Sequence, residues 1–275
     1  MKTKQKKELK WHILFIIIIL ILLYPIVYAV STSFKSLNEA YNNILSLIPE
    51  NPTTSAYQRV LHIIPFFKIT LNTFIIASIV TIFKLLTGVL AAYSFVFLKF
   101  KGKQWLYFIL ISTIFIPFTV TMIPNFIIIS KLGLKDNIIG VVLPQLADAT
   151  GIFLLRQHMR GIPTSLLEVA KLEKTPHITI LRTIVVPIIR PAILSMGIIF
   201  FINSWNEFVW PSLILKSTEN YTLSLALQMF VSSEGGTDIP VAMAISVLTM
   251  LLPLLIYAMC QKFIINTFAQ SGIKG

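Results

Sequence analysis

Six long apolar runs restrict what this chain can fold into. Each run approaches the length of about 20 residues that an α-helix needs to cross a bilayer. They are Trp11–Ser31, Leu71–Leu98, Trp105–Ser130, Ile138–Arg156, Ala192–Leu215 and Val241–Phe263. The runs are too long and too evenly apolar for the alternating strands of a membrane barrel. We therefore expect an all-α integral membrane protein with six transmembrane helices.

The composition supports the same class. Hydrophobic residues make up 56% of the chain and charged residues 12%, whereas an average soluble protein carries about 25% charged residues. A soluble domain could not bury so much apolar surface. Residues 1–31 share the basic start and apolar core of a signal peptide, but the core is longer than usual. We expect this segment to be kept as the first transmembrane helix.

Lysine and arginine are unevenly distributed among the segments that join the apolar runs. Most of them lie in residues 2–10, in the turn 99–103 and in the segment 156–190. Because cytoplasmic loops are enriched in these residues, we predict that both termini are cytoplasmic. The same bias explains the net charge of +12 without a nucleic-acid partner, which would need basic and aromatic residues on one soluble face.

The sequence offers no catalytic or metal-binding pattern. Its single cysteine, Cys260, excludes an internal disulfide and a Cys-rich metal site, and the four histidines lack the spacing of a zinc helix. The phosphate-binding pattern G-x-x-x-x-G-K-[ST] is also missing. We therefore expect no catalytic residue, no metal site and no cofactor in this chain.

A charged, proline-containing segment from Ser165 to Pro191 interrupts the apolar sequence. Ser165 and Glu168 have the spacing of a capping box, which predicts that a helix begins there. Pro176 disfavours the helical conformation in the residue before it, so this helix should end close by. The expected apolar side holds Leu166, Val169, Ala170 and Leu172, and the polar side Glu168, Lys171 and Lys174. The pattern alone fits a docking surface or an amphipathic helix on the membrane surface.

This segment resembles the EAA loop of the inner-membrane permease subunits of ABC importers, whose pattern is E-A-A-x-x-D-G-A followed by L-P-x-x-x-P. The matching residues are Glu168, Val169, Ala170, Glu173, Lys174, Pro187 and Pro191. Glu173 replaces the usual Asp and keeps its charge, whereas Lys174 replaces the usual Gly. Glycine accepts a positive φ without strain, so a turn with positive φ at Lys174 would be strained.

Other segments extend the resemblance over most of the chain after Pro65. They are Leu71–Thr81, Ala91–Lys103, Leu143–Met159, Ser204–Pro211 and Ser271–Gly275. They are typical of the carbohydrate-uptake branch, which includes maltose-type and glycerol-3-phosphate-type importers. The resemblance implies a tail, first helix and external loop over 1–70, a permease domain over 71–265 with its EAA loop at 163–191, and a cytoplasmic tail over 266–275.

The resemblance implies a subunit of a binding-protein-dependent importer in the bacterial cytoplasmic membrane. Such a subunit translocates a sugar, an oligosaccharide or glycerol 3-phosphate by ATP-driven alternating access. The implied partners are a second permease, two cytoplasmic ATPase subunits that bind ATP and Mg, an extracytoplasmic substrate-binding protein and membrane lipid. Two alternatives remain. One is an ion-driven secondary transporter, whose internal repeats we do not find, and the other is a membrane assembly subunit that carries nothing.

Polar residues inside the apolar runs form a second candidate site, because a charge at mid-bilayer costs about 3 kcal/mol or more. They are Lys84, Asp148, Asn203, Trp205, Asn206 and Glu207. One interpretation places them along a transport pathway, where the Trp205 ring would offer a flat face to a sugar. In the other, Lys84 and Asp148 form a structural pair between the second and fourth spans.

Two connections are expected outside the membrane. Thr32–Phe67 should form an external loop with one surface helix, and Lys216–Ile239 a loop made flexible by Gly235 and Gly236. In maltose-type relatives the second loop enters the binding protein. Several prolines inside the apolar runs predict kinked helices, since neighbouring groups in a membrane bundle can satisfy the freed carbonyls. They are Pro25, Pro117, Pro124, Pro144, Pro211 and Pro253.

Overall fold

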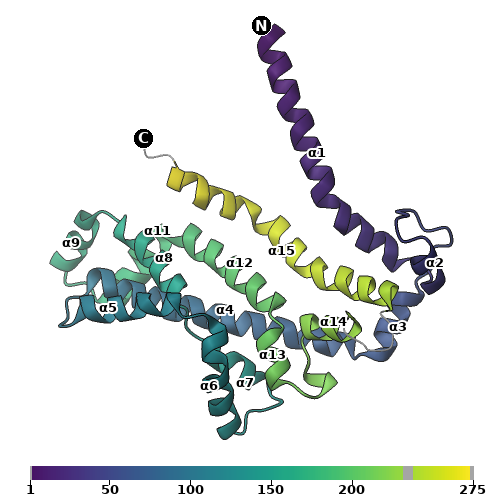
Figure 1. Ribbon diagram of the computed structural model, residues 1–275. Coiled ribbons are helices and arrows are strands. Elements are labelled where there is room, and N and C mark those ends of the chain that lie inside the picture. Colours follow the sequence, from purple (N-terminus) through teal and green to yellow (C-terminus); the bar gives the residue numbers. More distant parts are fainter. Residues whose placement is uncertain (1, 232–237, 273–275) are drawn as a thin grey trace. The chain divides into compact units, whose positions relative to one another are not determined.

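The computed structural model describes residues 2–231 and 238–272, which form helices joined by short connections (Figure 1). No strand occurs within these two ranges, so the predicted all-α class is confirmed. Two compact units divide the chain. The first comprises Met1–Phe66 and Ala226–Leu252, and the second Phe67–Leu225 and Pro253–Gly275.

The first unit contains α1 (Lys2–Ser33), α2 (Leu37–Asn42) and α3 (Ser55–Ile63). The second contains α4 (Phe66–Phe97), α5 (Lys103–Ser112), α6 (Phe118–Lys131), α7 (Ile138–Val142), α8 (Ala149–Arg160), α9 (Thr164–Leu172), α10 (His177–Ile180), α11 (Val186–Ile188), α12 (Arg190–Asn206) and α13 (Val209–Ile214). Short 3-10 turns cover Thr113–Phe115, Leu143–Gln145 and Thr218–Asn220, and a π-helical turn covers Leu181–Val185. Residues of both units contribute to α14 (Leu223–Val231) and α15 (Ile239–Gly272).

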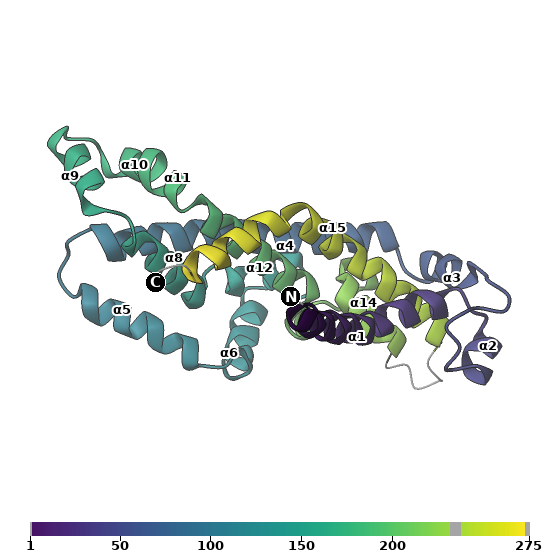
Figure 2. The same ribbon diagram turned by 90° about the horizontal axis from the view of Figure 1, so that it is seen from above.

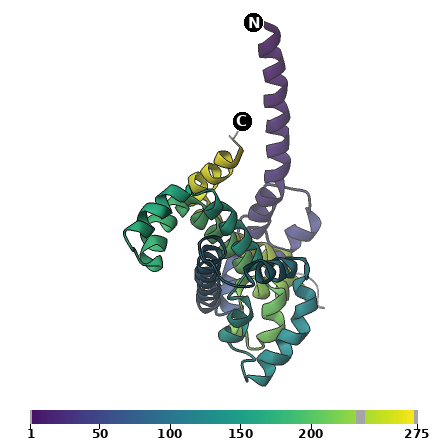
Figure 3. The same ribbon diagram turned by 90° about the vertical axis from the view of Figure 1, so that its left-hand side faces the viewer.

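Three helices confirm predicted spans. The segments Leu9–Ser33 of α1, Phe66–Phe97 of α4 and Ile239–Met259 of α15 are each long and apolar enough to cross a membrane. The α1 helix is the long helix that begins at the N-terminus (Figure 3), and Pro25 lies inside it. None of its most apolar window is buried within the chain, and an apolar surface on all sides suits a helix surrounded by lipid or by another subunit.

The other three predicted spans are not single helices. The run Trp105–Ser130 bends by 101° between Phe115 and Phe118, where Pro117 lacks an amide hydrogen. The run Ile138–Arg156 bends by 45° between Gln145 and Ala149. The run Ala192–Leu215 is interrupted after Asn206, and α12 instead makes a 79° pair with the helical segment His177–Ile188. Counting each bent pair as one span gives at most six spans within residues 2–231 and 238–272.

The second unit has a core that joins residues 163–191, the EAA segment, to the long helices. This core includes Ala92 of α4, Met159 of α8, Leu167 of α9 and Met196 of α12. The helix α9 lies at the end of the unit where α5 begins and α8 ends (Figures 1 and 2). Gly151 lets α8 approach α12, because a Cβ atom there would lie 2.5 Å from Cζ of Phe200.

The connection Thr32–Phe67 contains two helices, α2 and α3, where we expected one. Lys35 is fully buried in this connection. Its Nζ donates to the carbonyl oxygens of Asn43 at 3.0 Å and Ser46 at 2.6 Å. Because a buried ammonium needs partners, these two bonds hold the chain after α2 in a compact turn.

Candidate functional site

The EAA segment forms α9, with limits close to those expected. The helix begins at Thr164, so Ser165 lies inside its first turn and is not the predicted cap. It ends at Leu172, before Pro176, as predicted. Beyond it, the Thr175 amide donates to the Ala170 carbonyl at 3.0 Å. This bond closes the turn that commonly ends a helix with a left-handed residue.

Lys174 is that left-handed residue, with a φ of 55°. It stands where the EAA pattern has glycine, the residue that takes this conformation without strain. The chain therefore keeps the turn while lacking the glycine. The strain expected at Lys174 for a positive φ is about 1 kcal/mol or more.

The two sides of α9 differ from the predicted pattern. Leu167 and Ala170 are buried in the core of the second unit. Three residues of the expected apolar side are exposed instead: Leu166 by 46%, Val169 by 57% and Leu172 by 84%. Glu168 is also exposed, as expected. One side of α9 is thus fixed to the chain, and the other offers apolar side chains and a carboxylate.

The small side chain of Ala170 faces the core of the second unit. In the structure it is 6% exposed and contacts the chain's own core. A size limit at Ala170 then follows from packing within this chain.

The rest of the EAA segment leads into α12 through a sharp bend. Pro191 lies in the first turn of α12, where its missing amide hydrogen removes no helical bond, and Pro187 lies near the end of the helical segment His177–Ile188. The 79° bend lies between them, at Ile189. Nearby, the Tyr93 hydroxyl of α4 is hydrogen-bonded to Nδ1 of His177 at 2.9 Å. Sequence reasoning missed this contact, since no local pattern relates two residues so distant in the chain.

Lys84 and Asp148 lie close together, as the structural interpretation requires. Lys84 Nζ is 3.7 Å from Asp148 Oδ2 and 5.3 Å from the centre of the Phe200 ring. Asp148 Oδ1 also accepts from the Gly151 amide at 2.7 Å, so Asp148 caps the start of α8. The carboxylate lies at the break between α7 and α8 and not within a continuous helix.

Glu207 occupies a similar position between α12 and α13. Its Oε1 accepts from the amides of Val209 at 2.8 Å and Trp210 at 3.3 Å. Asn203 and Asn206 are exposed. Trp205 is fully buried and stacked on Phe201, with ring centres 5.8 Å apart. Its ring face is therefore closed to a sugar in this conformation.

Asp136 is a residue that sequence reasoning missed. It joins the connection before α7 to the one after α13, because its carboxylate accepts from the amides of Lys216 at 2.9 Å and Ser217 at 3.0 Å and from the Ser217 hydroxyl. These bonds, the hydroxyl first, hold the pKa of Asp136 well below its usual range. Asp136 has a φ of 54°, and Asp and Asn tolerate this conformation better than most residues. The pair Asp136-Asn137 before an apolar run was thus a usable turn signal.

The second external connection is described in part. It contains the 3-10 turn Thr218–Asn220 and helix α14, while residues 232–237, on which the expected flexible loop depended, lie outside the described residues. Lys68 Nζ is 2.5 Å from the Glu219 carboxylate, and this hydrogen bond lowers the pKa of Glu219. Within residues 2–231 and 238–272, no group of three His, Cys, Asp or Glu side chains could hold a metal ion.

Comparison with known proteins places these features in a family. Residues 84–266 match the family described as the inner membrane component of binding-protein-dependent transport systems. The chain is 27% identical to the sn-glycerol-3-phosphate transport system permease protein of Yersinia pestis bv. Antiqua, over 94% of this chain and 95% of that protein. It is 26% identical to the arabinooligosaccharides transport system permease protein of Halalkalibacterium halodurans, over 100% of both.

The fold is also similar to a solved structure. A chain from the crystal structure of a bacterial ABC transporter involved in the import of the acidic polysaccharide alginate superposes with a TM-score of 0.84. The two chains are 25% identical, over 95% of this chain and 98% of that one. This chain therefore belongs to the family of inner membrane components of binding-protein-dependent transport systems.

Proposed function

We propose that this chain is a permease subunit of an ABC importer that carries a sugar, an oligosaccharide or glycerol 3-phosphate. The family match and the substrates named for its relatives support this class of solute. The bias of Lys and Arg supports a cytoplasmic position for both termini and for the EAA segment. The importer would also contain a second permease, two ATPase subunits that bind ATP and Mg, and an extracytoplasmic binding protein.

The arrangement of α9 carries the proposal. Leu166, Glu168 and Val169 on its exposed side suit contact with an ATPase subunit, with the Glu168 carboxylate facing a basic residue. Leu167 and Ala170 on its other side are part of the core that includes residues of α4, α8 and α12. A displacement of α9 by the ATPases would therefore move the long helices together. In our proposal this motion alternates the access of a pathway between the two sides of the membrane.

We assign the substrate pathway to the break between α12 and α13. The exposed amides of Asn203 and Asn206 lie just before this break, and Glu207 follows them. Amide groups donate and accept hydrogen bonds and so suit hydroxyl-rich solutes. We assign Lys84 and Asp148 to structure, because each serves as the other's charge partner.

The test uses the assembled importer in proteoliposomes, with ATPase activity and solute uptake measured side by side. Glu168→Lys should abolish uptake and weaken ATPase association while the chain still inserts and folds. Ser165→Lys is the matched control, because it adds a cation to the exposed side of the same helix and leaves Glu168 in place. Normal uptake by Glu168→Lys would remove the coupling role. Uptake that persists without ATP and follows an ion gradient would support a secondary transporter instead.

A further inference from the structure

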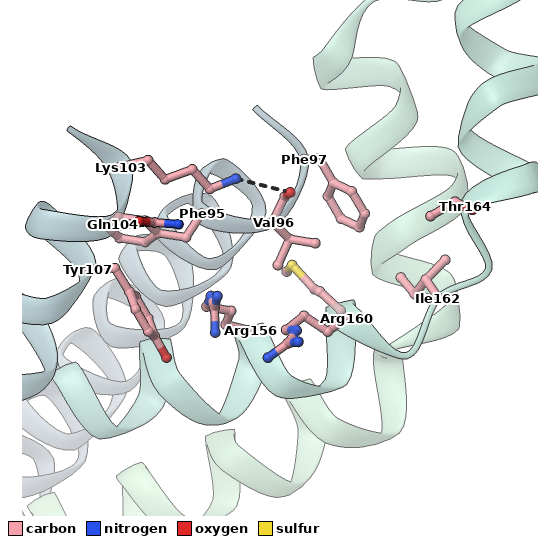
Figure 4. A pocket seen from close by; sticks show the side chains of 11 residues that line it. Phe95, Val96, Phe97, Lys103, Gln104, Tyr107, Arg156, Arg160, Ile162 and Thr164 are labelled. Carbon is pink, nitrogen blue, oxygen red and sulfur yellow. Dashed lines mark hydrogen bonds between the residues drawn. The ribbon is translucent and has the colours of Figure 1, made fainter. Parts of the chain in front are cut away.

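A basic cavity lies beside the EAA segment. Its volume is about 540 Å³, and it is lined by residues from the end of α4, the start of α5 and the end of α8 (Figure 4). Three cations line it: Lys103, Arg156 and Arg160. Within residues 2–231 and 238–272, none of these three forms a salt bridge with a carboxylate. The cavity thus holds positive charge that the described part of the chain does not neutralise.

The contacts of these side chains leave polar atoms unsatisfied. Lys103 Nζ donates to the carbonyl oxygens of Val96 at 3.2 Å and Leu98 at 2.9 Å. The Arg156 guanidinium lies over the Tyr107 ring, 3.9 Å from its centre. Arg156 Nε and the Tyr107 hydroxyl are both buried without a hydrogen-bond partner. Buried polar atoms of this kind are rare and often mark a place for an ion or water.

The two arginines also repel each other. Arg156 and Arg160 are four residues apart on α8, so they lie on the same side of the helix, and like charges at this spacing destabilise it. An anion between them would remove the repulsion and accept hydrogen bonds from both guanidinium groups. Phosphate oxygens match the fork geometry of arginine.

The surroundings of the cavity are those of a membrane–water interface. It lies at the ends of three helices that belong to candidate spans. A second hollow of about 400 Å³ shares Lys103 and Gln104 with it and is bounded by Lys99 and Trp105. Trp105 is 73% exposed. Tryptophan and lysine are enriched where lipid headgroups meet the apolar core of a bilayer.

We propose that this cavity binds the phosphate of an anionic phospholipid headgroup. Basic pockets between membrane helices suit such headgroups, and the exposed apolar residues Leu106, Phe108 and Ile109 on α5 would contact the acyl chains. Lipid binding depends on the proposed function in one respect only, which is the side of the membrane to which the cavity is assigned. Because Thr164, the first residue of α9, also lines the cavity, a bound headgroup would restrict the motion of the first turn of α9.

The test measures thermal unfolding of the purified complex that contains the full chain in neutral detergent. The complex is titrated with dioctanoyl phosphatidylglycerol, dioctanoyl phosphatidylcholine or sodium phosphate. We expect saturable stabilisation by phosphatidylglycerol alone. The variant Arg156→Gln/Arg160→Gln should raise its apparent Kd by about 30-fold, since each basic residue near a membrane surface contributes on the order of a fivefold factor. The matched control Lys101→Gln/Arg182→Gln removes two exposed cations outside the cavity and should leave the Kd unchanged.

Two further variants keep the test valid if the double variant does not fold. Arg160→Gln changes an exposed side chain and should still weaken binding, whereas Arg156→Lys keeps the charge and should bind. Equal stabilisation by phosphatidylcholine, or by sodium phosphate, would overturn the proposal, and so would an equal loss in the control. An unchanged Kd for phosphatidylglycerol in a folded Arg156→Gln/Arg160→Gln complex would also overturn it. Because no arm measures uptake, lipid binding and the proposed transport function can fail separately.

Discussion

Replacing Lys174 by glycine should stabilise the end of α9. The left-handed conformation of Lys174, with its φ of 55°, costs a non-glycine residue about 1–2 kcal/mol. Glycine removes this strain but loses more conformational entropy on folding, which takes back about 0.5–1 kcal/mol. The net gain is then about 0–1.5 kcal/mol, with a midpoint of about 0.75 kcal/mol. It should slow hydrogen exchange of the Thr175 amide, which closes the turn onto Ala170, by about two- to fivefold.

Hydrogen exchange of the purified complex, followed by mass spectrometry, measures this effect peptide by peptide. Lys174→Ala is the first control, because it removes the charge but keeps the Cβ atom that causes the strain, so exchange should not slow. Glu173→Gly is the second, because Glu173 is not among the described residues with positive φ and glycine there should speed exchange. Faster exchange in Lys174→Gly than in the native chain would refute the argument. It would mean that the Lys174 side chain makes a contact worth more than the strain.

Three further predictions concern packing, charge pairing and pH. Gly151→Ala should lower the midpoint of thermal unfolding and reduce the free energy of unfolding by about 1–3 kcal/mol, because the added Cβ would lie 2.5 Å from Phe200 Cζ. An unchanged midpoint in this variant would contradict the close approach of the two helices. Lys84→Met should reduce the yield of folded protein by leaving Asp148 unpaired, and adding Asp148→Asn should restore yield and uptake together; restored yield without uptake would instead favour a role in the pathway. The Asp136 carboxylate, whose pKa is lowered by its bonds to the next connection, should stabilise that connection above a pH of about 3.9 and lose this effect as the pH falls below it. Asp136→Ala should speed exchange of the two amides that it binds already at pH 7.

The apolar runs predicted helices more reliably than they predicted where those helices bend. Hydropathy reports which residues avoid water, and it places α4 within a few residues of its observed limits. A run such as Trp105–Ser130 remains apolar through its 101° bend, so hydropathy cannot locate the break. The prolines narrow the position, yet Pro25 lies within a continuous helix while Pro117 separates two. Whether a proline interrupts a helix depends on the packing of neighbouring helices, which the local sequence does not specify.

The EAA segment shows a similar limit. Periodicity correctly predicted a short helix that ends before Pro176, but it grouped Ala170 with Leu166, Val169 and Leu172 as one apolar side. The structure buries Ala170 and exposes the other three. In a soluble monomer, exposed leucine and valine on one helix would argue against the assignment. In a subunit of an assembly, they are the residues that a partner can cover.

The positions of the carboxylates inside the predicted spans explain how their charges are stabilised. The cost of a mid-bilayer charge applies to a side chain on a continuous helix, where the backbone amides are already bonded. Asp148 and Glu207 lie instead at helix breaks, and each accepts from amides at the start of the next helix. Those amides are free donors at the positive end of a helix dipole, so each carboxylate stabilises the break while the break stabilises its charge. Only Oε1 of Glu207 accepts from these amides, so a transport role for Glu207 would use either its second carboxylate oxygen or a conformation in which Oε1 leaves the start of α13.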